Sequence, residues 1–303
     1  MTSQLDVGRL RLLREVGLRG SIAAAARAVG LTPSAVSQQL ALLERETATA
    51  LIDRSPRGVV LTGAGHALAA RAGQVLDVLV AARADLDRLA GSVTGPVAVA
   101  SVASAAVTVL SDAVAALRDS SPGIEVSVVA VEPDRGIGLL LTGDVDLAVV
   151  DEYDYVPLAL PDGAVVRELD AEPLVVVRPA GTPRRRRGPE LADFADAEWV
   201  MPPEDAACGR AVRAACRTAG FEPRVRWETD DMLLLVRAVA SGHGVAVLPR
   251  RSVAQDAAAV DVQPLREPTL TRRLLVVARP SVAARPVVAE VLDALSATAL
   301  RRL

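Results

Sequence analysis

The sequence contains few of the side chains that hold metals, form disulfides or catalyse reactions. Its 303 residues include no lysine, two cysteines and two histidines, so arginine supplies all 34 basic side chains. Cys208 and Cys216 are too few for a disulfide framework, which suits a reducing cytoplasm. A zinc site would need further ligands, and His66 and His243 are the only histidines. Because a P-loop and a nucleophile elbow are also missing, we expect no metal, no cofactor and no enzymatic activity.

Long apolar stretches are missing as well, although 51% of the residues are hydrophobic. No run of eighteen apolar residues occurs, so neither a transmembrane helix nor a membrane partner is expected. The N-terminal residues lack the apolar core and the small-residue cleavage site of a signal peptide, which predicts a cytoplasmic location. The composition is that of a globular protein, and the length suffices for about two domains.

Charge is distributed unevenly along the chain, whose net charge is -3. Residues 1–58 carry eight arginines against five acidic residues, whereas residues 91–303 carry 23 arginines against 29 acidic residues. A basic N-terminal part on an acidic remainder allows one end of the molecule to approach phosphate groups. This pattern favours a nucleic-acid partner for the N-terminal part.

Capping residues predict two short helices joined by a tight turn near the N-terminus. Ser21 is a good N-cap for an alanine-rich helix, and Gly30 provides the left-handed residue that ends it. Thr32 then caps a second helix, in which Pro33 occupies the first position, where its missing N–H is not needed. Two helices with this spacing are typical of a helix-turn-helix.

The second helix is predicted to have an apolar and a polar face. Its inward residues follow helical spacing; they are Val36, Leu40 and Leu43. Its outward face has short hydroxyl and amide side chains; they are Ser34, Ser37, Gln38 and Gln39. Such a face can enter a major groove, where glutamine can pair with adenine through two hydrogen bonds. The alternative is an ordinary surface helix.

A short basic hairpin is predicted directly after these helices. Leu51–Arg54 and Val59–Leu61 have strand character, and the turn Ser55–Gly58 between them carries Arg57 at its tip. A helix-turn-helix followed by such a wing indicates DNA binding much more specifically than either part alone.

These segments resemble the winged helix-turn-helix of LysR-type transcriptional regulators. The resemblance rests on AAAxxxGLTPSAVSQQ, followed by LLERE and DRSPRGVVLTGAG. It implies that the second helix reads the major groove of double-stranded DNA and that the wing contacts the backbone or the minor groove. The DNA-binding residues that it implies are Thr32, Pro33, Ser34, Ser37, Gln38, Gln39, Arg54 and Arg57. Two positions depart from the family pattern, Ala48 for glycine and Ile52 for phenylalanine, and we expect both to affect the packing of the wing.

A long helix is predicted over residues 62–91, after a DNA-binding domain that comprises residues 1–61. Its apolar residues alternate in steps of three and four; they are Leu68, Ala72, Val75, Leu79, Ala82, Leu86 and Leu89. This heptad-like seam favours a homodimer on a pseudo-palindromic operator, or a homotetramer made of two such dimers. A helix packed on the core of its own domain would show the same period.

The remainder, residues 92–303, alternates strands and helices, which predicts an α/β architecture. It resembles the two-lobed, periplasmic-binding-protein-like (type 2) effector domain of the same family in segments such as GDVDLAVV and VASGHGVAVLP. The resemblance implies lobe I over about 92–172 and 269–303, lobe II over about 173–268, and a cleft between them for a small-molecule effector.

Residues at strand ends and helix starts are predicted to contact that effector. They are Ser104, Asp151, Cys208 and Thr229. Ser104 is expected to cap a helix, and Asp151 to close a strand that precedes it. A carboxylate at Asp151 favours an effector with an ammonium or guanidinium group. The alternative for each residue is a cap or loop position without a ligand.

The prediction is therefore a sequence-specific DNA-binding transcriptional regulator that a small-molecule effector switches, with RNA polymerase as a further partner that this function allows. One alternative is a thiol-based redox sensor on the same scaffold. It would use Cys208 and Cys216, although eight residues of one helix separate them by roughly 12 Å. A solute-binding protein would need a signal peptide, and an enzyme on this fold would need an acid/base pair; the sequence offers neither.

Overall fold

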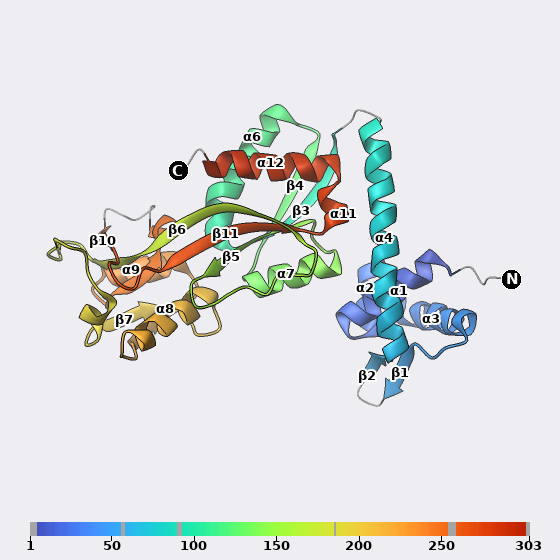
Figure 1. Cartoon of the computed structure of the whole chain (residues 1–303), viewed down its shortest axis with the longest axis horizontal. Helices are drawn as coiled ribbons and strands as arrows, with labels where there is room; N and C mark the ends of the chain where they lie inside the picture. Colours follow the sequence, from blue (N-terminus) through green and yellow to red (C-terminus); the bar gives the residue numbers. More distant parts are fainter. Residues whose placement is uncertain (1–4, 56–57, 90–92, 185, 254–258, 301–303) are drawn as a thin grey trace.

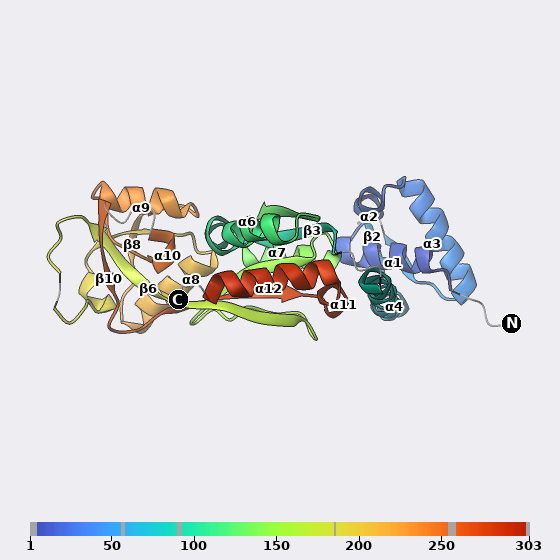
Figure 2. The ribbon, with the colours of Figure 1, turned by 90° about the horizontal axis from the view of Figure 1, so that it is seen from above.

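The computed structural model (Figure 1) describes residues 5–55, 58–89, 93–184, 186–253 and 259–300. The chain forms an N-terminal winged helix-turn-helix, a single long helix and a two-lobed α/β body. These parts lie in a row along the long axis of the molecule, with lobe I between lobe II and the winged helix-turn-helix (Figure 2).

The winged helix-turn-helix consists of three helices and a two-stranded hairpin. Its elements are α1 (Val7–Arg19), α2 (Ile22–Val29), α3 (Pro33–Thr47), β1 (Ile52–Ser55) and β2 (Gly58–Leu61). The predicted caps are confirmed. The hydroxyl of Ser21 accepts from the N–H of Ala24 at 3.1 Å, and the hydroxyl of Thr32 accepts from that of Ala35 at 3.2 Å. Gly30 ends α2 in the left-handed region, with a φ of 69°.

The inward face of α3 holds this domain together. Val36, Leu40 and Leu43 have no exposed surface, and they pack with Leu13 of α1 and Leu51 before β1. Each buried side chain of this size contributes about 1.5–3 kcal/mol. The core therefore fixes α3 against α1 and against the start of the wing.

Ala48 ends α3 in the left-handed conformation, with a φ of 49°. This region costs an L-residue roughly 1–2 kcal/mol that glycine does not incur. The prediction that Ala48 affects the packing of the wing is wrong, because its side chain is exposed and its effect is on the backbone of the helix end. Ile52, the other departure, does lie in the core of the domain.

The long helix α4 (Gly63–Leu89) follows the wing. The first residues of its apolar seam complete the core of the winged helix-turn-helix. Leu68 packs against this core, and Ala72 is only 1% exposed. Val75, Leu79 and Leu86 further along are exposed. The seam is thus divided between the domain core and a free apolar surface. No described helix, α4 included, is both long and apolar enough to cross a membrane.

Lobe I is a mixed sheet with helices on both faces. Its strands are β3 (Gly95–Ser101), β4 (Ile124–Ala130), β5 (Leu147–Tyr153), β11 (Thr271–Ala278) and the first part of β6 (Val165–Pro179). β3 pairs in parallel with β4 and β5, whereas β11 runs antiparallel between β5 and β6. The helices of lobe I are α5 (Ala103–Ala105), η1 (Ala106–Leu110), α6 (Ser111–Ser120), α7 (Pro133–Thr142), α11 (Pro280–Ala283) and α12 (Pro286–Leu300). α6 and α12 pack on one face of the sheet and α7 on the other.

Lobe II contains the second part of β6 together with shorter elements. They are η2 (Leu191–Phe194), β7 (Glu198–Met201), α8 (Ala207–Thr218), β8 (Arg224–Glu228), α9 (Met232–Ala240), β9 (Ala246–Pro249), α10 (Arg250–Val253) and β10 (Val260–Pro264). β9 and β10 pair antiparallel with β6, and β7 pairs in parallel with β8. α8 packs on one side of β6 and α9 on the other.

One strand, β6, belongs to both lobes. Pro173 is its last residue paired with β11, and Leu174 is its first residue paired with β9. The chain therefore passes from lobe I to lobe II inside a strand, which Figure 1 shows running alongside β11 between the lobes.

Both tryptophans lie in lobe II. Trp199 of β7 is fully buried, and its indole N–H donates to the carbonyl oxygen of Phe194 at 3.1 Å. Trp227 of β8 is 46% exposed, and its ring stacks on the imidazole of His243 with the ring centroids 4.9 Å apart. One indole thus lies in a dry core and the other at the surface.

Candidate functional site

The exposed face of α3 carries the polar side chains that are predicted to read DNA. Its exposed members are Thr32, Pro33, Ser34 and Gln38, and its half-buried members are Ser37 and Gln39. The first turn of α3 contains no acidic residue. Nothing in that turn would repel the phosphates of a DNA duplex.

Arg9 of α1 ties the middle and the end of α3 to the domain. Its Nε donates to the Gln39 amide oxygen at 3.0 Å, and its Nη1 donates to the Glu46 carboxylate. The amide oxygen of Gln39 is therefore engaged inside the domain. Gln38, which is exposed, is the better placed of the two glutamines to reach a base.

The wing is joined to α3 through the Glu44 carboxylate, which accepts from the backbone N–H groups of Leu51 and Ile52 at 2.8 and 3.1 Å. Arg54 lies on β1, where its backbone is described but its side chain is not. Arg57 lies outside the described residues. The contacts of both arginines with DNA remain predictions.

The second candidate site is a cavity of about 40 Å³ between the two lobes. Lobe I contributes residues that follow β3 and β4 and residues of β5 and β11, and lobe II contributes the N-terminal ends of α8 and α9. The polar side chains that line it are Ser104, Glu132, Asp151, Tyr153, Asp230 and Arg272. A space of this size holds water rather than a metabolite. The lobes must therefore separate to admit a larger ligand.

Arg272 of β11 lies against this cavity and is only 2% exposed. Its Nη1 donates to the Ser104 hydroxyl at 2.7 Å and lies 3.4 Å from Asp151 Oδ2, and its Nη2 donates to Glu172 Oε1 at 2.5 Å. The Tyr153 hydroxyl also donates to Asp151 Oδ2, at 2.9 Å. A guanidinium group of the chain itself thus lies beside the carboxylate that was expected to attract an effector's cation.

Burial governs the ionisation of the groups around the cavity. Burial raises the pKa of Asp151. The charge of Arg272 and the hydrogen bond from the Tyr153 hydroxyl act in the opposite direction and lower it. Burial alone would lower the pKa of Arg272, but Tyr153 and the carboxylate partners raise it above its usual value, so the guanidinium stays charged. Burial, together with repulsion from Asp151 and Asp230, raises the pKa of Glu132. Three carboxyl groups, those of Glu132, Asp151 and Asp230, line the cavity against the single guanidinium of Arg272, so ionised carboxylates give it an excess of negative charge.

Three of the four residues predicted to bind an effector come together at the cavity; they are Ser104, Asp151 and Cys208. Thr229 is not among the lining residues, and its hydroxyl accepts from the N–H of Asp231 at 3.2 Å. It helps to order the start of α9 beside the cavity.

Two local predictions about these residues are wrong. Ser104 is not a helix cap: Val102 precedes α5, and the Ser104 hydroxyl binds Arg272 instead. Asp151 does not close a strand, because β5 continues to Tyr153 through its pairing with β11.

The sequence reasoning did not find Glu132, Tyr153, Asp230 and Arg272. Glu132 follows β4 and precedes α7, and Asp230 lies just before α9. Glu132 and Asp230 thus occupy the kind of position, a strand end or a helix start, that could have predicted their contact with an effector. Arg272 gave no signal, since its partners Ser104 and Glu172 are 168 and 100 residues away in the sequence.

The cysteines are buried thiols on one helix. Cys208 and Cys216 of α8 are 3% and 0% exposed, and burial raises the pKa of each to about 12. A thiol with this pKa is almost fully protonated at neutral pH and is a poor target for peroxide. The geometry thus gives no support to the thiol sensor. Within the described residues, no three histidine, cysteine or acidic side chains converge to hold a metal ion.

Comparisons with known proteins identify the two parts of the chain that carry these candidate sites. Residues 7–66 match the model of the bacterial regulatory helix-turn-helix protein, lysR family, and residues 90–299 match that of the LysR substrate binding domain. The small neutral protease regulatory protein of Streptomyces coelicolor is 30% identical, over 96% of this chain and 92% of its own length.

Two solved structures are similar over almost the whole chain. A full-length OxyR variant from Pseudomonas aeruginosa aligns over 96% of this chain and 95% of its own, at 20% identity and a TM-score of 0.72. Full-length CbnR in complex with its target DNA aligns over 97% of this chain and 100% of its own, at 20% identity and a TM-score of 0.56.

The fold of these structures is that of the present chain. Since the two family models together cover nearly all of it, the chain belongs to the LysR family and is a DNA-binding transcriptional regulator with an effector-binding domain.

Proposed function

We propose that the protein binds a pseudo-palindromic operator as a homodimer or homotetramer, with α3 of each subunit in the major groove. The observation that carries this proposal is the exposed hydroxyl and amide face of α3, on a helix that Arg9 and the domain core hold rigidly. The arginines of the wing, Arg54 and Arg57, contact the DNA backbone or minor groove. The protein acts in the cytoplasm, where its effect on transcription passes to RNA polymerase.

The free part of α4 supports the pairing of two subunits. Val75, Leu79 and Leu86 are 41%, 49% and 61% exposed, and they follow the seam beyond the residues that serve the domain core. Steps of four and seven residues place them on one side of a helix. A second copy of α4 against this side removes their surface from water and places two recognition helices on one duplex.

Replacement of Gln38 by alanine is expected to weaken binding to the operator roughly 10- to 100-fold. A bidentate glutamine–adenine contact contributes about 1–3 kcal/mol of discrimination, and Gln38 has the exposure that such a contact needs. The measurement is a titration, at fixed salt, of a duplex that the wild-type protein has selected from a random library.

A scrambled duplex of the same length is the internal control, because phosphate contacts alone hold it. The Gln38→Ala protein should bind it as the wild type does and with the same dependence on salt concentration. An unchanged affinity for the selected duplex would show that Gln38 does not read the DNA.

The effector in this proposal carries an ammonium or guanidinium group and binds between the lobes. Glu132 comes from lobe I and Asp230 from lobe II, and both line the cavity. Neither carboxylate has an ion-pair partner within the described part of the chain, whereas Asp151 is matched by Arg272. Two unpaired carboxylates on opposite lobes repel each other, and a cation between them favours closure of the lobes.

Glu132→Gln is expected to reduce the affinity for a cationic effector about tenfold. Binding needs the ionised carboxylate, so the wild-type affinity falls as the pH falls through the pKa of Glu132. Because that pKa is raised, the loss begins at a higher pH than a glutamate with its ordinary pKa would give. Calorimetric titrations with basic amino acids and diamines between pH 5 and 8 measure both effects.

Asp134→Asn is the matched control, since Asp134 is an exposed acid on the first turn of α7 and does not line the cavity. It should leave both the affinity and the pH profile unchanged. If Glu132→Gln bound the amines as the wild type does, the cationic class would be excluded.

A further inference from the structure

A second and much larger cavity lies where the winged helix-turn-helix, α4 and lobe I meet. It lies at the end of lobe I remote from the inter-lobe cleft. Its volume is about 720 Å³, which is within the range of small-molecule sites. Its walls are α1, α4, the start of β3, the C-terminal end of α7 and the segment around α11. We call it the junction cavity.

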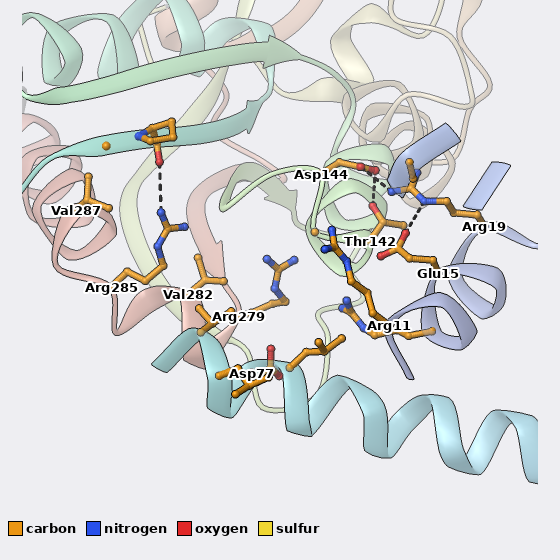
Figure 3. Close-up of a pocket in the computed structure, with 18 of the residues that line it drawn as sticks. Arg11, Glu15, Arg19, Asp77, Thr142, Asp144, Arg279, Val282, Arg285 and Val287 are labelled. Carbon is orange, nitrogen blue, oxygen red and sulfur yellow. Dashed lines mark hydrogen bonds and ion pairs between the residues drawn. The ribbon is translucent and has the colours of Figure 1, made fainter. Parts of the chain in front are cut away.

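Arginines of α1 hold the DNA-binding domain against lobe I at this place. Arg19 Nη2 lies 2.7 Å from Asp144 Oδ1, and Arg19 Nε lies 2.8 Å from Glu15 Oε2 (Figure 3). Arg14 Nη2 donates to the carbonyl oxygen of Leu141 at 3.0 Å. The position of α1 relative to lobe I therefore depends on side chains that line the cavity.

The opposite wall joins lobe I to α4 and also contains contacts within lobe I. The Ser281 hydroxyl of α11 donates to Asp77 Oδ1 of α4 at 2.8 Å. Arg285 Nη1 lies 2.7 Å from Asp146 Oδ1, and its Nη2 donates to the carbonyl oxygen of Pro96 at 3.4 Å. All three parts of the chain thus meet around one space.

The junction cavity has more positive charge than its carboxylates neutralise. Five arginines line it, and ion pairs account for Arg19 and Arg285. Within the described residues, Arg11, Arg14 and Arg279 have no carboxylate within ion-pair distance. In the view of Figure 3, Arg279 lies between Arg285 and Arg11.

The end of α7 keeps these like charges close to one another. Arg279 donates to the carbonyl oxygen of Leu140, and Arg14 to that of Leu141, in the last turn of the helix. Backbone carbonyls at this end carry the negative pole of the helix dipole, which offsets only part of two full charges. Burial, followed by repulsion from Arg14, lowers the pKa of Arg279 even though Asp77 and Asp146 act against the shift.

We infer that the junction cavity binds a small oxyanion, either a phosphate monoester or a dicarboxylate, that several guanidinium groups contact at once. Arg11 and Arg14 contact it from α1, and Arg279 contacts it from lobe I. Guanidinium groups bind such oxyanions through paired N–H donors. The five arginines face four carboxylates, those of Glu15, Asp77, Asp144 and Asp146, so positive charge remains in excess for an anion to balance.

The bound anion joins the DNA-binding domain to lobe I. Without it, Arg279 repels Arg14, and the polar contacts of Arg19 and Arg14 hold α1 against lobe I in opposition to this repulsion. With it, the same arginines share a counter-charge, and the arrangement in Figure 1 becomes more stable than one in which the domains separate. Because the site lies apart from the inter-lobe cleft, it gives the regulator a second input.

Calorimetric titration of the full-length protein tests this inference. The probes are inorganic phosphate, glucose 6-phosphate and succinate, each at constant ionic strength in chloride. At least one should bind, and Arg11→Gln and Arg279→Gln should each weaken it about tenfold or more. Arg11 is exposed, so its variant keeps the fold. Binding of the two phosphates without succinate assigns a phosphate monoester, and the reverse assigns a dicarboxylate.

Two controls separate this site from other arginines. Arg118→Gln, on the exposed side of α6, and Arg45→Gln, on α3 in the DNA-binding domain, should both retain the wild-type affinity. Hydrogen exchange should also slow in α1 and in residues 140–144 when the anion binds. Absence of binding by all three probes, wild-type affinity in Arg11→Gln and Arg279→Gln, or unchanged exchange at the junction would overturn the inference.

Discussion

Replacement of Arg272 by methionine is expected to lower the free energy of unfolding of the effector domain by about 3–5 kcal/mol. The change leaves Glu172 and Asp151 buried without their positive partner, at 6% exposure each. Methionine fills the volume of the lost side chain but supplies no hydrogen-bond donor to either carboxylate. Urea unfolding followed by circular dichroism measures the change.

Arg167→Met is the matched control for this experiment. Arg167 forms an ion pair with Asp293 at 2.7 Å, but the two side chains are 41% and 69% exposed. Surface pairs of this kind contribute at most about 1 kcal/mol. If both substitutions changed the stability equally, the buried network around Arg272 would have no special role in holding β11 to its neighbours.

Gly209→Ala is expected to destabilise lobe II by about 1–3 kcal/mol or more. A Cβ atom at this position of α8 would lie 2.0 Å from the carbonyl oxygen of Pro203 and 2.6 Å from that of Pro202. Both are backbone atoms, so the start of α8 must shift. That end of the helix carries Cys208 and lines the inter-lobe cavity, and the substitution should also weaken binding of the effector.

Gly138→Ala provides a control of opposite sign. Gly138 lies inside α7, and a Cβ there would meet no atom within 4 Å. Alanine in an open helix position stabilises by roughly 0.5–1 kcal/mol relative to glycine. The two melting temperatures should therefore move in opposite directions, and a stabilising Gly209→Ala would contradict the tight packing of α8.

Local chemistry predicted the helix-turn-helix closely. Ser21, Gly30 and Thr32 cap the helices as expected, since a cap depends on residues within one turn. The buried trio Val36, Leu40 and Leu43 follows from helical spacing alone. Ala48 shows the limit of this reasoning, because the left-handed position that it occupies is normally signalled by a glycine, which is missing here.

Pairing between distant segments explains most of the remaining errors. The antiparallel partner β11 extends β5 past Asp151 to Tyr153, and nothing near Asp151 in the sequence signals that strand. β6 passes through both lobes without a break, so no turn residue marks the boundary inside it. The partners of Arg272 are likewise brought to it only by the sheet.

The apolar periodicity of α4 alone did not predict which of its residues pack on their own domain and which are exposed. Leu68 and Ala72 share the spacing of Val75 and Leu79, yet the first two pack on their own domain and the last two are exposed. The same pattern satisfies a helix that packs on its own core and one that pairs with a second copy. The junction cavity was equally hidden, because its arginines come from separate parts of the chain.

The placement of both tryptophans in lobe II gives the molecule a fluorescence reporter of one lobe. Trp199, in the buried core, should emit at short wavelength, whereas Trp227, which is stacked on His243 and 46% exposed, responds to solvent. The rest of the chain contains no indole. Changes in this emission therefore originate in lobe II or at its borders, and events at the DNA-binding domain can be followed separately with a dye.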